Sequence, residues 1–124
     1  MKRRHKPHPP STKMLDALCR LVVLARDGHR CRRCGATNRL QWCHIYSRRY
    51  QSLRWHTLNS MMLCAGCHLW QHHNPIEGGR FFESELGREW DKLQLIRRTP
   101  RKVDREAERL ALLAELNGQA GDKC

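Results

Sequence analysis

Two Cys-x-x-Cys pairs constrain the fold of this 124-residue chain more than any other feature of its sequence. Cys31 and Cys34 form the first pair, and Cys64 and Cys67 form the second. Four thiolates on two short turns match the tetrahedral ligand set of an all-cysteine zinc site. Because such a site leaves no coordination position open, its Zn²⁺ stabilises the fold and activates no water. Redox-active thiols are the alternative, but two pairs spaced in this way favour a structural metal.

The remaining cysteines and the short apolar runs indicate the compartment. The chain has seven cysteines, an odd number, and no apolar segment typical of a secretory signal. A disulfide framework is therefore disfavoured. No apolar run reaches the length of a membrane span, so we expect a cytoplasmic protein. Cys19 falls inside a predicted helix, and we interpret it as a packed hydrophobic residue and not as a ligand.

The positive charge of the chain is concentrated in its first two thirds. The formal net charge is +12. Residues 28–76 contain seven arginines and no Asp or Glu, whereas residues 77–124 contain as many basic as acidic residues. Ordinary surfaces mix both signs, and a field of one sign attracts polyanions. This distribution predicts a nucleic-acid partner, with a merely soluble basic surface as the alternative.

The hydropathy pattern predicts a small α+β protein. We divide it into a flexible basic arm over residues 1–11, a compact domain over residues 12–98, a C-terminal helix over residues 99–118 and a disordered tail over residues 119–124. The prolines of the arm exclude a helix there. The arm either lies along a phosphate backbone or has no role. The leucines of the C-terminal helix favour a core or dimer surface.

Periodicity and capping residues place the individual elements. We expect strands over residues 40–45 and 60–64, separated by a polar, arginine-rich loop. Helices are expected from residue 11 or 12 to Gly28, from Ala65 to His73, beyond Gly78-Gly79 with a division at Gly87, and from Asp104 to Asn117. The buried face predicted for the first helix consists of Met14, Leu18, Leu21, Val22 and Ala25.

Three polar residues stand in a fixed order around the cysteine pairs. His44 and Asn59 lie between the pairs, and His68 follows the second pair directly. With these residues, residues 26–75 resemble the HNH endonuclease family, whose core is a zinc-bound ββα-metal fold. The segments His44-Ile-Tyr-Ser-Arg-Arg49 and Cys64-Ala-Gly-Cys-His68 are also similar to those of phage-encoded members.

The resemblance implies an activity and a role for each of these residues. It implies hydrolysis of phosphodiester bonds in duplex or branched DNA, with phage replication, recombination or packaging proteins as partners. His44 would be the general base, Asn59 would orient it or lie beside the metal, and His68 would bind a catalytic Mg²⁺, Mn²⁺, Ni²⁺ or Zn²⁺. The chemistry is consistent, because hydrolysis needs an activated water and a cation. A neutral imidazole accepts a proton near pH 7.

One residue departs from the family pattern. Cys43 stands where much of the family has a metal-binding Asp, and no acidic residue lies nearby in the sequence. His72 lies four residues after His68 and shares its helix face, so His72 and Cys43 are further candidate ligands. Nitrogen and sulfur donors favour zinc, nickel, cobalt or manganese over magnesium. The alternative for Cys43 is a strand thiol that packs inward.

Arginines follow the candidate base and are suited to holding nucleic acid. Arg48, Arg49 and Arg54 can bind phosphate through two donors each. Phosphate contacts position the backbone without reading sequence, so we expect weak sequence preference and strong salt dependence. A non-catalytic zinc-ribbon module that binds nucleic acid is the competing class, and it leaves the order of His44, Asn59 and His68 unexplained.

Overall fold

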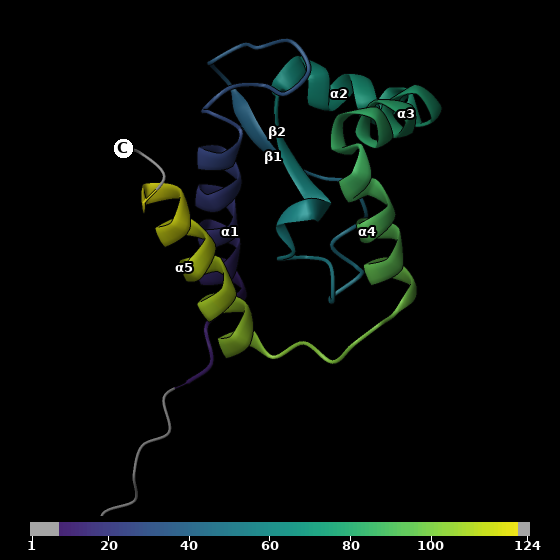
Figure 1. Cartoon of the computed structure of the whole chain (residues 1–124). Helices are drawn as coiled ribbons and strands as arrows, with labels where there is room; N and C mark the ends of the chain where they lie inside the picture. Colours follow the sequence, from purple (N-terminus) through teal and green to yellow (C-terminus); the bar gives the residue numbers. More distant parts are fainter. Residues whose placement is uncertain (1–7, 122–124) are drawn as a thin grey trace, which may run out of the picture.

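A computed structural model describes residues 8–121 of the chain (Figure 1). Within them lie five α-helices and one two-stranded antiparallel sheet. The elements are α1 (Thr12–Arg26), β1 (Leu40–His44), the 3-10 turn η1 (Thr57–Asn59), β2 (Ser60–Cys64), α2 (Ala65–His73), α3 (Pro75–Leu86), α4 (Arg88–Arg98) and α5 (Arg105–Gly121). The α+β class predicted from the sequence is therefore confirmed.

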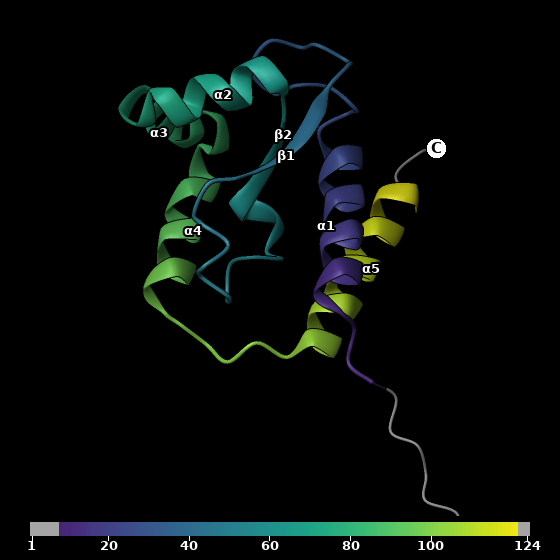
Figure 2. The ribbon, with the colours of Figure 1, turned by 180° about the vertical axis from the view of Figure 1, so that it is seen from behind.

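The sheet lies at the centre, with helices on both sides. Figures 1 and 2 show α1 and α5 side by side on one flank of the sheet, with α2, α3 and α4 on the other. In the sheet register, Leu40 pairs with Cys64 and His44 pairs with Ser60. The hairpin therefore has one end at the second cysteine pair and the other at the loop between the strands.

Two hydrophobic clusters flank the hairpin. The first consists of Leu15, Cys19, Val22, Val23, Trp55, Met62 and Leu112 and joins α1 and α5 to β2. The second consists of Cys31, Cys43, Met61, Leu63, Cys67 and Phe82 and joins the sheet to α2 and α3. Because Met61 and Met62 alternate along β2, the two faces of one strand contribute to the two clusters.

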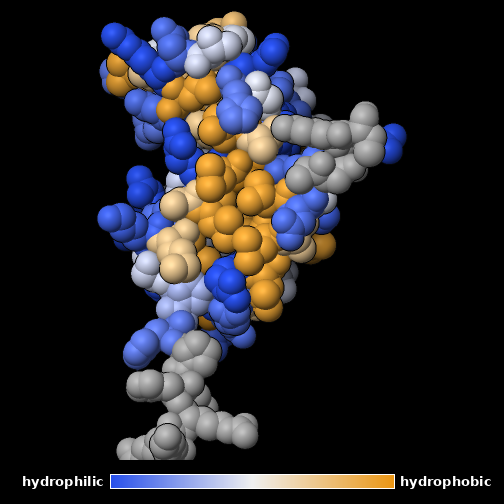
Figure 3. Space-filling view, turned by 90° about the vertical axis from the view of Figure 1, so that its left-hand side faces the viewer, coloured by the Kyte–Doolittle hydropathy of each residue, from blue (hydrophilic) through white to orange (hydrophobic). Residues whose placement is uncertain are grey.

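Helix α1 begins as predicted, and its buried face agrees in part with the predicted one, because Val22 is buried and Leu18 packs against the first cluster. The Ser11 Oγ atom accepts a hydrogen bond from the Met14 amide (3.1 Å), which caps the helix. Cys19 is fully buried, which confirms its interpretation as a packed residue. Met14 and Leu21, expected in the core, are 53% and 51% exposed. Figure 3 shows an apolar area over α1 and α5.

Two helix boundaries differ from the sequence expectation. Helix α3 begins at Pro75, before Gly78-Gly79, because proline is favoured in a first helical turn. Gly78 lies so close to α2 that an added Cβ would be 3.0 Å from the Gln71 Cβ. Helix α5 continues past Asn117 to Gly121. Its last turns are held against α1, because Gln119 Nε2 donates to the Val22 carbonyl (3.1 Å).

The predicted arm and tail fall partly outside the described residues. Residues 1–7 and 122–124 lie outside them. Within the predicted arm, Pro10 is buried, and its carbonyl accepts a hydrogen bond from Arg105 (3.1 Å). Residues 119–121, expected in the tail, belong to α5. The division between α3 and α4 at Gly87, whose φ is +58°, agrees with the prediction.

No helix among residues 8–121 has the length and apolar character needed to cross a membrane.

Candidate functional site

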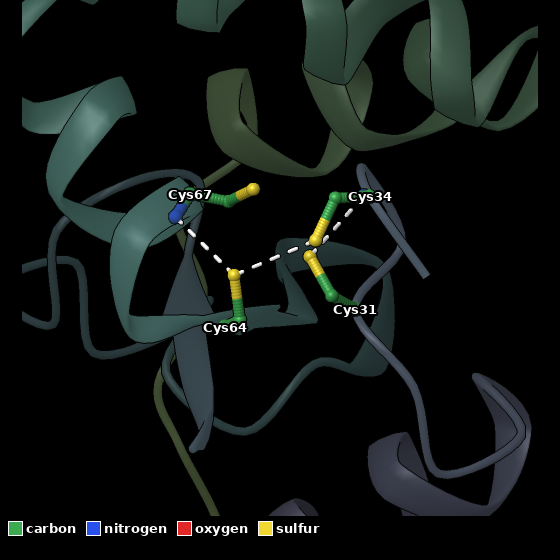
Figure 4. A group of neighbouring side chains, drawn as sticks. All are labelled: Cys31, Cys34, Cys64 and Cys67. Atoms are coloured by element: carbon green, nitrogen blue, oxygen red, sulfur yellow. Dashed lines mark hydrogen bonds between the residues drawn. The ribbon is translucent and has the colours of Figure 1, made fainter. Parts of the chain in front are cut away.

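The four paired cysteines form one cluster. Their side chains, Cys31, Cys34, Cys64 and Cys67, point toward one another (Figure 4), and all four sulfurs lie within 4.8 Å of each other. The Sγ atoms of Cys34 and Cys64 are 3.6 Å apart. A tetrahedral ion with Zn–S bonds of about 2.3 Å requires sulfurs about 3.8 Å apart. The cluster could therefore hold a structural metal such as zinc, as the sequence predicts.

Backbone amides around the cluster favour thiolates. In each pair the amide of the second cysteine donates to the sulfur of the first, at 3.5 Å for Cys34 to Cys31 and 3.4 Å for Cys67 to Cys64. Gly35 has a φ of +80°, which lets the chain turn back after the first pair. Cys64 is also the N-cap of α2. The second pair thus fixes the start of the helix that carries His68.

The thiols of the cluster differ in how readily they ionise. Burial opposes ionisation of Cys31, but backbone hydrogen bonds from neighbouring residues outweigh it and lower the pKa of this thiol to about 6. Burial and the neighbouring thiols raise the pKa of Cys67 to about 12. Four sulfurs this close cannot all carry negative charge without a counter-ion. A divalent ion removes this conflict and allows all four to ionise.

Three histidines of the predicted site line one cleft. His44 lies at the end of β1, and His68 and His72 lie on one face of α2. The cleft has a volume of about 430 Å³ and is completed by Trp42, Ile45, Ser47, Arg48 and Gln71. Strand β1 and helix α2 meet because the second cysteine pair joins the hairpin to the helix. The structure thus brings together the imidazoles that the sequence separates by 24 positions.

The ring of His44 is held in one orientation. Its Nε2 atom lies 3.1 Å from the Arg54 carbonyl oxygen, to which the ring donates a hydrogen bond. The lone pair is then on Nδ1. The ring contacts the indole of Trp42, with ring centroids 4.2 Å apart. Burial lowers the pKa of His44, and the charges of Arg48 and Arg54 add to this effect, so the imidazole is neutral near pH 7.

His68 and His72 lie with one ring nitrogen of each side by side. Their Nε2 atoms are 3.1 Å apart, and His68 Nδ1 lies 2.6 Å from Gln41 Oε1. Burial lowers the pKa of His68, and His72 and Arg48 lower it further. Two nitrogens bound about 2.1 Å from one ion would be about 3.0–3.4 Å apart. The pair therefore fits two adjacent ligand positions of a transition metal.

Asn59 positions the loop and does not contact the His44 ring through any hydrogen bond in the described part of the chain. It is fully buried. Its Oδ1 accepts from the Tyr46 amide (2.9 Å), and its Nδ2 donates to the carbonyls of Tyr46 (3.0 Å) and Leu53 (3.2 Å). Asn59 thus fixes both ends of the segment 46–53. Because Arg54 follows Leu53 directly, Asn59 supports the carbonyl that holds His44.

The prediction that Cys43 binds an ion in the cleft is wrong. Its side chain is fully buried in the cluster with Cys31, Met61 and Phe82. Successive strand residues point to opposite faces, so Cys43 faces away from the cleft that His44 lines. Burial raises the pKa of the thiol to about 12. Its alternative interpretation, an inward-packed strand thiol, describes it correctly.

The three loop arginines have different environments. Arg48 lines the cleft, and Arg49 is exposed next to Tyr50, which is itself exposed. The guanidinium of Arg54, also expected to bind phosphate, is paired with Asp16 at 2.8–3.0 Å. Asp16 also accepts from the indole of Trp55 (2.8 Å), which is a core residue.

The sequence did not predict the structural roles of two acidic residues, Asp27 and Asp16. The Asp27 side chain is 1% exposed and accepts hydrogen bonds from Arg26 (2.9 Å), Arg32 (2.9 Å) and the Met62 amide (2.8 Å). It thereby joins the end of α1 to the first cysteine pair and β2. The signal for Asp27 was its position beside Gly28 at a helix end. Asp16 gave no local signal, because its partners lie 38 and 39 positions away.

In comparisons with known proteins, no family model, curated protein or solved structure matches this chain. The structure itself defines a small α+β protein with a candidate tetrathiolate metal centre and, beside it, a histidine-lined cleft.

Proposed function

We propose that this chain is a metal-dependent DNA endonuclease of the HNH type. The observation that carries the proposal is the cleft in which His44, His68 and His72 meet beside Arg48. A neutral imidazole with one nitrogen fixed by a carbonyl is suited to general-base catalysis. Two further imidazoles and an arginine supply positions for a cation and for a phosphate.

His44 would accept the proton of the attacking water at Nδ1. Donation from Nε2 to the Arg54 carbonyl (3.1 Å) keeps the lone pair on Nδ1 and holds the ring in place. General-base assistance of this kind contributes about 10²–10⁴-fold to the rate. Trp42 covers one side of the ring and reduces its contact with bulk water.

His68 and His72 would hold the divalent ion through their Nε2 atoms. A bound ion would stabilise the negative charge that develops on the phosphate and the leaving oxygen. Nitrogen donors without a carboxylate favour zinc, nickel, cobalt or manganese over magnesium. No Asp or Glu is among the described residues that line the cleft.

Arg48 and Arg49 would bind the DNA backbone next to the scissile bond. Arg48 lies within the cleft wall and Arg49 on the exposed loop beside it. Neither side chain forms an ion pair with the part of the protein that the structure describes, so both guanidiniums can bind phosphate. These contacts would give affinity without sequence preference. Phage replication, recombination or packaging proteins would be the cellular partners of such an enzyme.

A non-catalytic nucleic-acid-binding module is the second candidate. The carboxylate-free lining of the cleft favours it, because two imidazoles alone bind a catalytic ion weakly. This module would retain the tetrathiolate metal and the arginines and would cleave no substrate.

Plasmid cleavage separates the two candidates. The zinc-loaded chain is incubated with supercoiled plasmid and Mg²⁺, Mn²⁺, Ni²⁺, Co²⁺ or Zn²⁺ in turn. His44→Ala is compared with His73→Ala. His73 is an exposed histidine at the end of α2 that does not line the cleft, so it is a matched control. Cleavage reduced at least about 10²-fold in His44→Ala and unchanged in His73→Ala supports the enzyme. Plasmid binding without cleavage in any metal supports the module.

A further inference from the structure

Gln41 is the residue of β1 that touches the proposed metal pair without belonging to it. Its side chain is exposed, and its Oε1 atom lies 2.6 Å from His68 Nδ1. Gln41 is the second residue of β1 and pairs with Leu63, near the end of β2 that leads into α2. Its amide therefore reaches the first turn of α2, and the short distance indicates a strong hydrogen bond.

This hydrogen bond determines which nitrogen of His68 carries the proton. An amide oxygen only accepts, so His68 Nδ1 is the donor and its Nε2 carries the lone pair. That lone pair faces the Nε2 atom of His72 at 3.1 Å. A metal ligand needs a lone pair on the coordinating nitrogen, and its other N–H is commonly fixed by an oxygen acceptor.

The two histidines of the pair differ in this respect. Within the described residues, His72 Nδ1 has no hydrogen-bond partner, and His72 is exposed. Its proton can therefore move between the two ring nitrogens through solvent at little cost. In the metal-free protein His72 donates from Nε2 to His68. For His72 to bind an ion through Nε2, its proton would move to Nδ1, which would leave the Nε2 lone pairs of both histidines available.

We infer that Gln41 is a positioning residue that fixes His68 in the Nδ1–H form, so that the Nε2 atoms of His68 and His72 together bind a transition-metal ion. The inference rests on the proposed function of the cleft as a metal site. It also assigns unequal roles to the histidines: His68 is the preorganised ligand, and His72 is the ligand that adapts. Removing an oxygen acceptor behind a metal-bound histidine typically lowers affinity 10–100-fold.

The test uses Co²⁺ as the probe, titrated into the full chain after its tetrathiolate site has been filled with Zn²⁺. Cobalt absorption gives the affinity of the cleft site, and His68→Ala defines the signal that belongs to it. Gln41→Leu is expected to lower that affinity about 10–100-fold. Gln41→Glu, which retains an oxygen acceptor, is expected to bind Co²⁺ at least as tightly as the unmodified chain. Gln51→Leu, the same change at an exposed loop residue, is the matched control.

A second measurement reads the proton directly. Nitrogen-15 spectra of the histidine rings in the zinc-loaded, cobalt-free chain are expected to show His68 protonated at Nδ1, and a mixture of both forms in Gln41→Leu. Thermal unfolding and zinc content should be the same in both, because the Gln41 side chain is exposed. The inference is overturned by an Nε2–H form of His68, by equal Co²⁺ affinity in Gln41→Leu, or by weaker binding in Gln41→Glu.

The outcomes distinguish the inference from the function on which it rests. If Co²⁺ affinity follows Gln41 as expected but no metal supports plasmid cleavage, the positioning role of Gln41 stands and the nuclease proposal fails. If cobalt binding is unaffected by His68→Ala, the inference fails, whereas cleavage lost in His44→Ala would still support a nuclease.

Discussion

The Nε2 atom of His44 lies 3.1 Å from the backbone oxygen of Arg54, a neutral acceptor. A carboxylate in that position would stabilise the imidazolium, whereas a carbonyl fixes the ring while leaving it neutral. The side chain of Arg54 reaches in the other direction and pairs with Asp16 of α1. One residue therefore links the orientation of the candidate base to a helix on the far side of the hairpin.

The pH dependence of cleavage should reflect this arrangement. Burial lowers the pKa of His44 below its ordinary value of about 6.5. A general base works when neutral, so activity is present above the lowered pKa and is lost as the pH falls through it. We expect the acidic limb of kcat/KM against pH to lie below pH 6.5. A limb at or above that value would contradict the environment described for His44.

Asn59 should act on the fold as well as on the rate. Asn59→Ala leaves the backbone amide and carbonyl of Tyr46 without these partners and leaves the Leu53 carbonyl with only the His56 amide. We expect a loss of at least about 2 kcal/mol in the free energy of unfolding, measured by denaturant titration. Cleavage should fall because the Arg54 carbonyl shifts, while the midpoint of the acidic limb moves little. Reduced cleavage with unchanged stability would instead indicate a direct catalytic role.

The loop arginines should divide into a DNA-binding pair and a structural residue. Arg48→Ala and Arg49→Ala are each expected to weaken binding of an oligonucleotide duplex and to reduce the slope of log K against log salt by about 1. Arg54→Ala should leave the slope unchanged and lower stability by about 1.5–3 kcal/mol, because Asp16 loses its charged partner. Arg98→Ala, an exposed arginine at the end of α4, is the control for net charge.

Removal of metal from the cysteine cluster should unfold the part of the molecule built on it. Cys34 is the most accessible of the four, so Cys34→Ser removes a ligand with little loss of packing. We expect that variant to bind no metal tightly and to lose the α2 signal in circular dichroism. Cys34→His supplies a nitrogen ligand and should recover part of the stability. Equal stability of the Ser variant and the unmodified chain would show that the cluster holds no structural ion.

The parts of the fold that the sequence predicted are those that short-range patterns determine. Each Cys-x-x-Cys turn fixes two sulfurs within a few residues. The position of each turn then determines where the neighbouring strand lies. His44 and His68 therefore came together as predicted, since each is close in sequence to elements that the cysteine cluster joins. The cap at Ser11 and the break at Gly87 are likewise local.

The predictions that failed concern which face of a helix or strand is buried. Helix α1 has apolar residues on two faces, and the packing of α5 selects Leu15 and Cys19 over Met14 and Leu21. Cys43 precedes His44 in sequence but points to the other side of the strand. The pairing of Arg54 with Asp16, 38 positions away, has no local pattern that indicates it.

The anchoring of the loop by Asn59 has a consequence for how this molecule could diversify. Asn59 secures Tyr46 at one end and Leu53 at the other, and the Ile45 amide closes the base of the loop onto the Asn59 carbonyl (2.8 Å). Residues 47–52 thus form a loop segment whose two ends are held in place, so its sequence can change without moving them. In the proposed nuclease, variation in the length or chemistry of this segment would alter which nucleic acid is bound, while the proposed catalytic residues on β1 and α2 kept their positions.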